Sequence, residues 1–179
     1  MIWFTSDTHF GHAKIIEYCN RPFNSSIEMN EHLIARWNGV VAPDDTVIHL
    51  GDFGLGRAAT LQAIFEQLNG EKILVRGNHD KQDVLKLGWR EVVPYMEMKI
   101  DGHFVVLSHY AFRVWNKSHR GSINLYGHSH NGLPDNSQQL DVGVDCWNFT
   151  PVSFTQILER LATLPPYRQP DKHSVAYNS

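Results

Sequence analysis

Aspartate, asparagine and histidine side chains recur in this sequence directly after short apolar runs. Residues 73–75 form one such run, and Gly77-Asn78-His79-Asp80 follows it almost at once. Four further apolar runs end in the same kinds of side chain. Seven residues from these five segments offer a carboxylate or amide oxygen or an imidazole nitrogen as a ligand: Asp7, His9, Asp52, Asn78, His109, His128 and His130.

This ligand set contains no thiolate. Imidazole and oxygen ligands suit divalent ions such as Mn, Fe, Co, Ni or Zn in a reactive site more than a structural zinc. Seven ligands are too many for one tetrahedral ion and about right for two ions that share a carboxylate. Paired ions roughly 3.5–4 Å apart clamp the attacking and leaving oxygens of phosphoryl transfer. The set therefore indicates phosphoryl-transfer chemistry.

The elements that must position these side chains follow from the apolar patterns. Asp101-Gly102, between two strand patterns, predicts a two-residue hairpin. We expect one α/β domain over residues 1–165, with parallel strands early, antiparallel strands later and helices outside, and a loosely held polar tail over 166–179. The predicted strands are 2–5, 46–50, 72–75, 92–100, 103–107, 123–126 and 140–144, and helices are predicted between Ser25 and Pro43, over 58–68, over 81–87 and from Pro151 onward.

Polar residues at several strand ends have a geometric consequence. In open α/β sheets, ligands bind outside the carboxyl ends of the strands. We therefore expect the five polar segments to meet at one edge of the sheet structure. Gly51, Gly77 and Gly127 precede three of them, and glycine lets the backbone turn sharply there.

Composition narrows the class of protein. The chain has 179 residues, 42% hydrophobic and 20% charged, as in an ordinary globular domain. Its net charge of -3 predicts no general attraction to nucleic acid or anionic membranes. Two cysteines without C-x-x-C spacing argue against a disulfide framework. No targeting pattern or membrane-spanning run occurs, so we expect a cytoplasmic protein.

The order of the polar segments along the chain is also specific. Asp-x-His, Gly-Asp, Gly-Asn-His-Asp, a single histidine after a strand, and Gly-His-x-His succeed one another between residues 5 and 130. This order resembles the calcineurin-like metallophosphoesterase superfamily. Asp7-Thr-His9-Phe-Gly-His12 and the segment 109–115 resemble a small bacterial and phage branch of it. The resemblance implies a β-sandwich of mixed sheets flanked by helices, in four layers, αββα.

The resemblance also implies a role for each matching residue. His79 matches a histidine that binds no metal and assists the leaving group, and we expect Asp80 to orient it. Asp52 matches a carboxylate that bridges two divalent ions, with Mn as our first choice and Fe, Ni, Co or Zn as alternatives. Asp7, His9 and His130 match the ligands of one ion, and Asn78, His109 and His128 match those of the other.

The implied reaction is hydrolysis of a phosphodiester or phosphomonoester by a hydroxide between the ions. Metal binding lowers the pKa of water toward neutrality, so this nucleophile exists at physiological pH. We expect a small, nucleotide-like substrate. Many relatives carry a further acidic residue soon after Gly-Asp, whereas residues 53–56 here are Phe-Gly-Leu-Gly. This departure leaves the substrate contacts of that loop open.

Several residues outside the ligand set are candidates for substrate contact. Arg76 is the arginine best placed to bind phosphate, ahead of Arg21 and Arg57. His12 either touches the substrate or a ligand, or simply ends its loop. Residues 110–121 combine aromatic and basic side chains, so Phe112 and Trp115 are predicted to border the substrate; alternatively, they fill space beside the sheet. Asp141 and Asp145 are interpreted as structural.

Two other functions remain open at this point. A nuclease of the same superfamily would share the chemistry, but such enzymes usually add domains to grip the polymer, and 179 residues leave little room. A scaffold that has lost catalysis would bind a protein partner instead. Such scaffolds tend to lose the catalytic histidine, whereas His79 and every ligand match are present.

Overall fold

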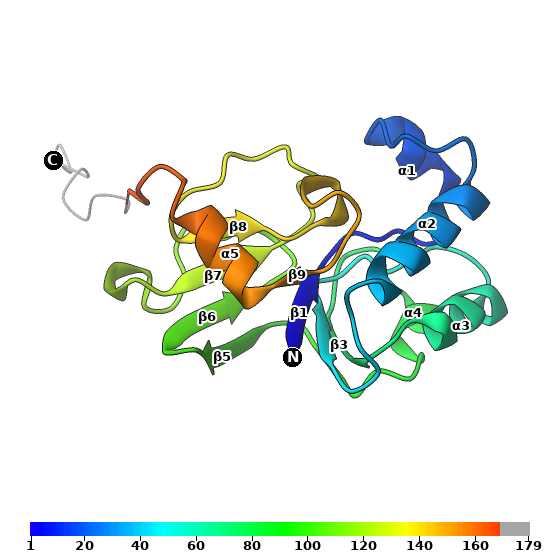
Figure 1. The fold of residues 1–179 in the computed structure, drawn as a ribbon, viewed down its shortest axis with the longest axis horizontal. Coiled ribbons are helices and arrows are strands. Elements are labelled where there is room, and N and C mark those ends of the chain that lie inside the picture. Colours follow the sequence, from blue (N-terminus) through cyan, green and yellow to red (C-terminus); the bar gives the residue numbers. More distant parts are fainter. Residues whose placement is uncertain (169–179) are drawn as a thin grey trace, which may run out of the picture.

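Two β-sheets packed against each other form the centre of the computed structural model, which describes residues 1–168 (Figure 1). The first sheet has five strands in the order β4-β3-β2-β1-β9. Four of them run parallel and the last pairs antiparallel with β1. The strands are β1 (Ile2–Thr5), β2 (Thr46–His49), β3 (Glu71–Val75), β4 (Glu91–Val93) and β9 (Val152–Ser153).

The second sheet has four strands in the order β5-β6-β7-β8. The predicted Asp101-Gly102 hairpin joins β5 to β6, and both turn residues have positive φ, as a type I′ turn requires. β6, β7 and β8 run parallel, so the expectation of antiparallel strands in this half is wrong for them. The strands are β5 (Met96–Ile100), β6 (His103–Leu107), β7 (Ile123–Tyr126) and β8 (Gln139–Asp141).

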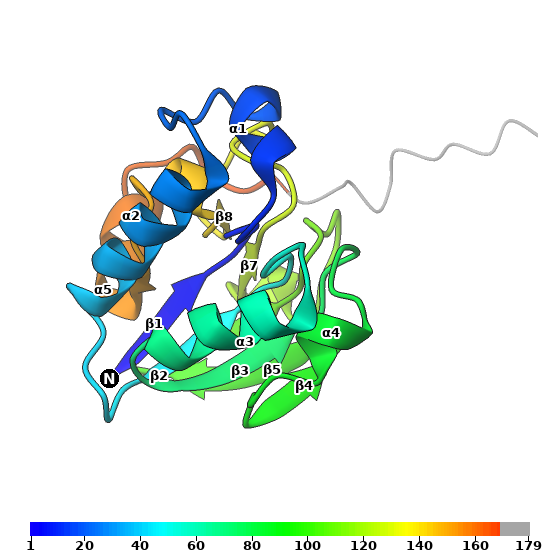
Figure 2. The same ribbon diagram turned by 90° about the vertical axis from the view of Figure 1, so that its right-hand side faces the viewer.

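Helices cover the outer face of the first sheet. α2 (Ser26–Asn38), α3 (Ala58–Gln67) and the short α4 (Gln82–Leu85) bury apolar residues against it, and Figure 2 shows α3 in front of β2 and β3. Ser25 caps α2, because its Oγ accepts a hydrogen bond from the Glu28 backbone N–H. No helix within residues 1–168 is long and apolar enough to cross a membrane.

The inner core lies between the sheets. Phe4 and Ile48 of the first sheet and Leu107 and Leu125 of the second are fully buried there. α5 (Phe154–Leu161) closes one end of this core by packing against β1, β9 and β8. The predicted mixed α/β sandwich with helices outside is therefore confirmed.

The chain crosses from one sheet to the other at a position where we expected one continuous strand. Residues 92–100 form two strands, β4 and β5, which belong to different sheets. Pro94 lies between them, and a proline cannot donate the hydrogen bond that a central strand position needs. The last helix begins at Phe154 rather than at Pro151, because Ser153 forms a capping box with Gln156. A short helix, α1 (Ala13–Tyr18), was not predicted.

The outer face of the second sheet is covered by the segment 110–121, which contains the 3₁₀ helix η1 (Ser118–Arg120). Lys117 Nζ lies 3.8 Å from the centre of the Phe104 ring on β6. Trp115 is 6% exposed, donates a hydrogen bond to the Ser122 carbonyl oxygen, and packs on Tyr167. Tyr167, which we expect to belong to the loosely held tail, instead donates hydrogen bonds to Ser137 Oγ and to the Arg113 carbonyl oxygen. The tail from residue 169 lies outside the described residues.

Candidate metal centre

The five polar segments meet at one edge, as the sequence predicted. Backbone hydrogen bonds join the loop after β1 to the loop after β2, from Asp7 N–H to the Gly51 oxygen and from His9 N–H to the Asp52 oxygen, both at 3.0 Å. His128 N–H donates to Asp7 Oδ2 at 2.8 Å and thereby connects the loop after β7. Loops from both sheets therefore form one polar centre.

Five of the seven candidate ligands have a left-handed backbone. The φ angles are 57° for Asp7, 49° for His9, 58° for Asp52, 67° for His128 and 47° for His130. This region is uncommon for residues other than glycine, and it persists only where the surroundings enforce it. The hydrogen bonds between the loops enforce it here, and they aim successive side chains at a common point.

The predicted role of the glycines is confirmed only at Gly51, whose φ is 99°. Gly77 and Gly127 do not have positive φ. They are needed for a different reason, which is close approach. A Cβ at Gly77 would overlap Asp52 Oδ1, and a Cβ at Gly127 would overlap Asp7 Oδ2.

The first group of ligand atoms comes from Asp7, His9 and His130. Asp7 Oδ1 lies 4.0 Å from His9 Nε2 and 4.0 Å from His130 Nε2. Asp7 Oδ1 and His9 Nε2 are buried without any hydrogen-bond partner. Because buried polar atoms are nearly always satisfied, these two orphaned atoms fit a divalent cation placed among the three side chains.

The second group comes from Asp52, His109 and His128. Asn78 joins it, because its Oδ1 lies 3.0 Å from His109 Nε2. Asp52 Oδ2 is 3.5 Å from His109 Nε2 and 3.6 Å from His9 Nε2. One carboxylate oxygen therefore lies between the two groups.

Hydrogen bonds behind the ligands fix the direction of two imidazoles. His109 Nδ1 lies 2.8 Å from the Leu50 carbonyl oxygen, and His130 Nδ1 lies 2.7 Å from Asp145 Oδ2. When Nδ1 carries the proton and donates it to such an oxygen, Nε2 keeps a lone pair for a metal. Asp145, which we had interpreted as structural, is therefore a partner of a candidate ligand.

Arg21 completes this support. Its Nε and Nη2 each donate to Asp145 at 2.8 Å, and its Nη groups also donate to the carbonyl oxygens of Asp7 and Thr8. The side chain is buried, so the earlier suggestion that Arg21 binds phosphate is wrong. No pattern in the sequence indicates this pairing, because 124 residues separate the two partners.

Burial sets the charge of the first group. Burial raises the pKa of Asp7 to about 7 and lowers the pKa of His9 to about 2. For Asp52, burial also acts to raise the pKa, but the hydrogen bond and positive charge of His109 outweigh it and lower the pKa to about 2. His9 is therefore a neutral ligand at physiological pH, and for Asp7 the effect of burial outweighs the opposing charges of His130 and His109.

A third group of side chains, Cys19, His130 and Asp145, also lies close together. Its geometry overlaps the first group through His130. Burial raises the pKa of the Cys19 thiol to about 11, so it stays protonated at neutral pH. Asp145 already accepts hydrogen bonds from Arg21 and His130. These groups are poorer ligands than Asp7 and His9.

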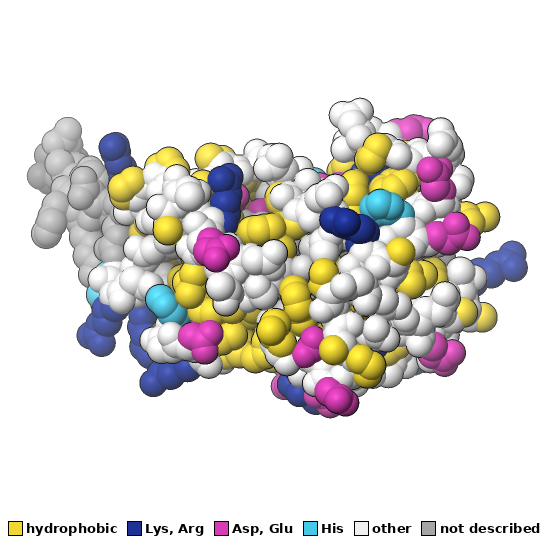
Figure 3. Space-filling view, in the orientation of Figure 1, with side chains coloured by type: hydrophobic (Ala, Val, Ile, Leu, Met, Phe, Trp, Pro, Cys, Tyr) yellow, Lys and Arg dark blue, Asp and Glu magenta, His cyan; other side chains and the backbone are white. Residues whose placement is uncertain are grey.

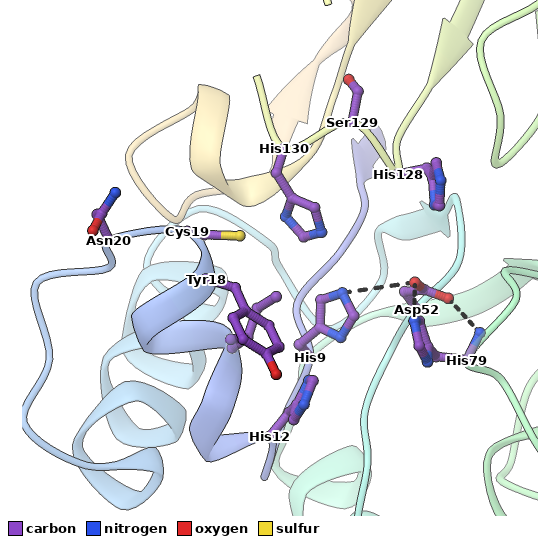
Figure 4. A pocket seen from close by; sticks show the side chains of 11 residues that line it. His9, His12, Tyr18, Cys19, Asn20, Asp52, His79, His128, Ser129 and His130 are labelled. Atoms are coloured by element: carbon purple, nitrogen blue, oxygen red, sulfur yellow. Dashed lines mark hydrogen bonds and ion pairs between the residues drawn. The ribbon is translucent and has the colours of Figure 1, made fainter. Parts of the chain in front are cut away.

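A cavity of about 560 Å³ opens beside the centre (Figure 4). Its inner end is lined by His9, Asp52, His79 and the segment 128–130, and residues of α1 and its flanks line the rest. The His79 side chain is 48% exposed, and its Nε2 lies 4.0 Å from Asp52 Oδ2. The predicted catalytic histidine therefore borders both the cavity and the ligand groups.

The expected pairing of Asp80 with His79 is not present. Asp80 accepts hydrogen bonds from the backbone N–H groups of Asp52, Phe53 and Gly77, at 2.8–2.9 Å. Both carboxylate oxygens thus hold the backbone around Asp52. Asp80 is a positioning residue for that loop, and this corrects its predicted role.

Of the four residues predicted to contact the substrate, one lines the cavity and three do not. His12 lines the cavity. Trp115 is buried in the cover of the second sheet, and Phe112 is half-buried against Tyr95, so neither borders the cavity. Arg76 is exposed but does not line the cavity either. Phe112 and Trp115 fill space beside the sheet, which is the alternative that the sequence leaves open.

Tyr110 is the residue of this loop that reaches the centre. Its hydroxyl donates to Asn78 Oδ1 at 3.2 Å, and its ring centre lies 4.6 Å from that of His128. The side chain is 48% exposed. Its place directly after His109 is the sequence signal that could have singled it out.

Comparison with known proteins identifies relatives over most of the chain. The family model of the calcineurin-like phosphoesterase superfamily domain matches residues 1–151. An uncharacterized protein of Methanocaldococcus jannaschii is 36% identical over 167 residues, which cover 88% of this chain and 89% of that protein. The gene 66 protein of Mycobacterium phage D29 is 33% identical, over 82% of this chain and 89% of that protein.

One solved structure is also similar throughout. The crystal structure of a protein of unknown function from Aquifex aeolicus superposes with a TM-score of 0.72 at 25% identity, over 89% of this chain and 98% of that one. The region that matches the family model contains His79 and all seven candidate ligands. The chain therefore belongs to the calcineurin-like phosphoesterase superfamily and is a metal-dependent phosphoesterase, a hydrolase.

Proposed function

We propose that the chain hydrolyses a small phosphodiester or phosphomonoester with two divalent ions that share Asp52. One observation carries the proposal: Asp52 Oδ2 lies within 3.6 Å of a histidine nitrogen from each ligand group. Asp7, His9 and His130 would hold one ion, and Asn78, His109 and His128 would hold the other. The choice of manganese and the assignment to the small bacterial and phage branch stay predictions.

The protein's own groups have distinct tasks in this reaction. Bound ions would act as Lewis acids and lower the pKa of water toward neutrality. His79 faces the cavity and can donate a proton to the leaving oxygen, as a general acid does. Its backbone N–H donates a hydrogen bond to Asp52 Oδ1 at 2.8 Å, which fixes the position of His79 relative to Asp52. Asp80 holds the loop that carries Asp52.

The size of the cavity supports a small substrate. A volume of about 560 Å³ falls within the range of roughly 300–1,000 Å³ that is usual for small-molecule sites. On the face drawn in Figure 3, basic and acidic side chains are intermixed, and no continuous basic stripe of the kind that tracks a nucleic-acid backbone is visible. The volume of the cavity therefore fits a nucleotide-like ester better than a polymer.

The test is hydrolysis of a panel of mono- and diesters, each with Mn, Fe, Co, Ni or Zn added after treatment with a chelator. We expect metal-dependent turnover by the wild-type protein. Asp52→Asn should lose at least one bound ion and nearly all activity. Full activity with two ions retained would refute the shared carboxylate. No turnover of any ester with any metal would instead support a scaffold that binds a protein partner.

A further inference from the structure

The cavity beside the centre extends in one direction, toward α1. Ile15, Tyr18, Cys19 and Asn20 line its outer part, together with His12 just before the helix. Figure 4 shows Tyr18 and His12 on the same side of His9, away from Asp52. A phosphoester whose phosphorus lies at the ions and His79 can therefore place one of its substituents along α1.

Aromatic rings form a continuous row along this direction. The ring centres of His79 and His9 are 5.6 Å apart, those of His9 and His12 are 5.4 Å apart, and those of His12 and Tyr18 are 6.5 Å apart. Tyr18 meets His12 edge to face at 78°. Tyr18 is also 68% exposed, so one side of its ring is open to a ligand.

Among the described residues, no Asp, Glu, Lys or Arg side chain lines the outer part of the cavity. Its lining consists of His12, Ile15, Tyr18, Cys19 and Asn20, and the nearby Arg21 is buried against Asp145. A second phosphate or carboxylate would find no cation there, whereas a flat, uncharged group would find an aromatic wall.

The wall is also held at a fixed distance from the centre. Ile15 is buried in the core cluster under α1, and the Arg21 N–H donates to the Ile16 carbonyl oxygen. The Arg21 guanidinium in turn donates to the Asp7 carbonyl oxygen at 2.7 Å. Because one residue contacts both the end of α1 and a candidate ligand loop, the wall and the centre keep their spacing.

We infer that α1 forms the subsite for an ester substituent, and that this subsite takes a flat, uncharged aromatic group that stacks on Tyr18. The inference rests on the proposed function, since the phosphorus must lie at the ligand groups and His79. It replaces Phe112 and Trp115, which the sequence had suggested for this contact.

Direct binding of two phosphonates to the Mn-loaded protein tests this subsite without any chemical step. Phenylphosphonate and methylphosphonate share the same head group, so the ratio of their dissociation constants, measured by calorimetry, isolates the aromatic substituent. We expect the wild-type protein to bind phenylphosphonate about 5- to 150-fold more tightly, the range of one aromatic stacking contact.

Variants assign this preference to one side chain. Tyr18→Ala should bring the ratio close to one and leave the affinity for methylphosphonate unchanged, whereas Tyr18→Phe should keep the wild-type ratio. Tyr95→Ala is the matched control, because Tyr95 is also an exposed tyrosine but does not line the cavity. Since Tyr18 is exposed, its removal should not alter the thermal midpoint.

Three results would overturn the inference: equal affinities in the wild-type protein, a ratio that survives Tyr18→Ala, or no binding of either phosphonate. The hydrolysis panel is measured separately, so the two claims can fail separately. Aromatic preference without turnover would leave the subsite and remove the proposed reaction. Turnover without aromatic preference would support the proposed reaction and rule out the aromatic subsite.

Discussion

At the scale of single residues, the centre is built from conformations that the chain would not adopt alone. Asp7, His9 and Asp52 are left-handed, and Gly77 and Gly127 leave room that a Cβ would fill. The sequence indicated these residues by type and order. It could not indicate their backbone angles, because the hydrogen bonds that enforce them come from loops distant in the chain.

His79 should matter for the rate and not for metal binding. It lies outside both ligand groups, so His79→Ala should retain its ions. Its turnover should fall by about 10²–10⁴, the usual worth of general acid–base catalysis. His119→Ala, which removes an exposed histidine on η1, should match the wild-type protein. Loss of metal in step with activity would mean that His79 is a ligand.

Gly77 should tolerate no side chain. Gly77→Ala would press a methyl group onto Asp52, so we expect the free energy of unfolding to drop by about 1–3 kcal/mol, as for other overpacked sites. Metal content should drop as well, because Asp52 must move. Gly56→Ala is the control, since a Cβ there meets nothing within 4 Å. Chemical denaturation and metal analysis of both variants test this; equal behaviour would contradict the account.

Asp7 should destabilise the metal-free protein at neutral pH. Its pKa is about 7 in the folded state, against an ordinary value of 3.8. Between these values the folded state holds a proton that the unfolded chain has released, so stability falls as pH rises. At about 1.36 kcal/mol per pH unit, the loss approaches about 4 kcal/mol by pH 7.

The substituted side chain of the Asp7→Asn variant does not titrate, so the stability of the variant lacks this dependence on pH. In the presence of a chelator, its free energy of unfolding relative to the wild-type protein should therefore rise from pH 4 to pH 7 and level off above pH 7. Urea denaturation at several pH values measures this difference. A difference that does not change with pH would show that Asp7 keeps its ordinary pKa.

At the scale of elements, the regular strands were predictable and the connections were not. β1, β2 and β6 match the predicted runs closely, because their apolar residues are buried on the sheets. Pro94 marks the crossing between the sheets, although the predicted strand 92–100 includes it. The segment 110–121 was interpreted as a substrate loop because its composition suits stacking, yet Trp115 satisfies its N–H on the Ser122 carbonyl oxygen and packs inward.

Arg21, which follows α1, and Asp145, in the 3₁₀ helix η2 (Val144–Cys146), support the centre together. Arg21→Met leaves the Asp145 carboxylate without its buried partner, so we expect a loss of about 3–5 kcal/mol in the free energy of unfolding. Arg21→Met/Asp145→Asn removes both charges and should recover part of this loss. Metal affinity should stay about 10–100-fold weaker in both variants, because His130 loses its oriented partner.

Arg120→Met, at an exposed arginine, is the matched control and should change neither quantity. Titration of the chelator-treated proteins with Mn, together with urea denaturation, separates stability from metal binding. Wild-type metal affinity in the double variant would contradict the positioning role of Asp145.

At the scale of the whole molecule, two sheets bring their strand ends to one edge. β1, β2 and β3 of one sheet and β6 and β7 of the other carry all seven candidate ligands in the loops that follow them. This convergence was predictable, because it follows from the rule for open α/β sheets. The division into two sheets was implied only by the resemblance to the superfamily, and nothing in the sequence indicated the cavity along α1, since both depend on packing between distant segments.

Anomalous diffraction from Mn-soaked crystals, recorded at the Mn absorption edge, tests the central claim most directly. The account predicts two peaks about 3.5–4 Å apart. One should lie among Asp7, His9 and His130, the other among Asn78, His109 and His128, with Asp52 between them. A single peak away from Asp52, or a peak bound by Cys19, His130 and Asp145, would contradict it.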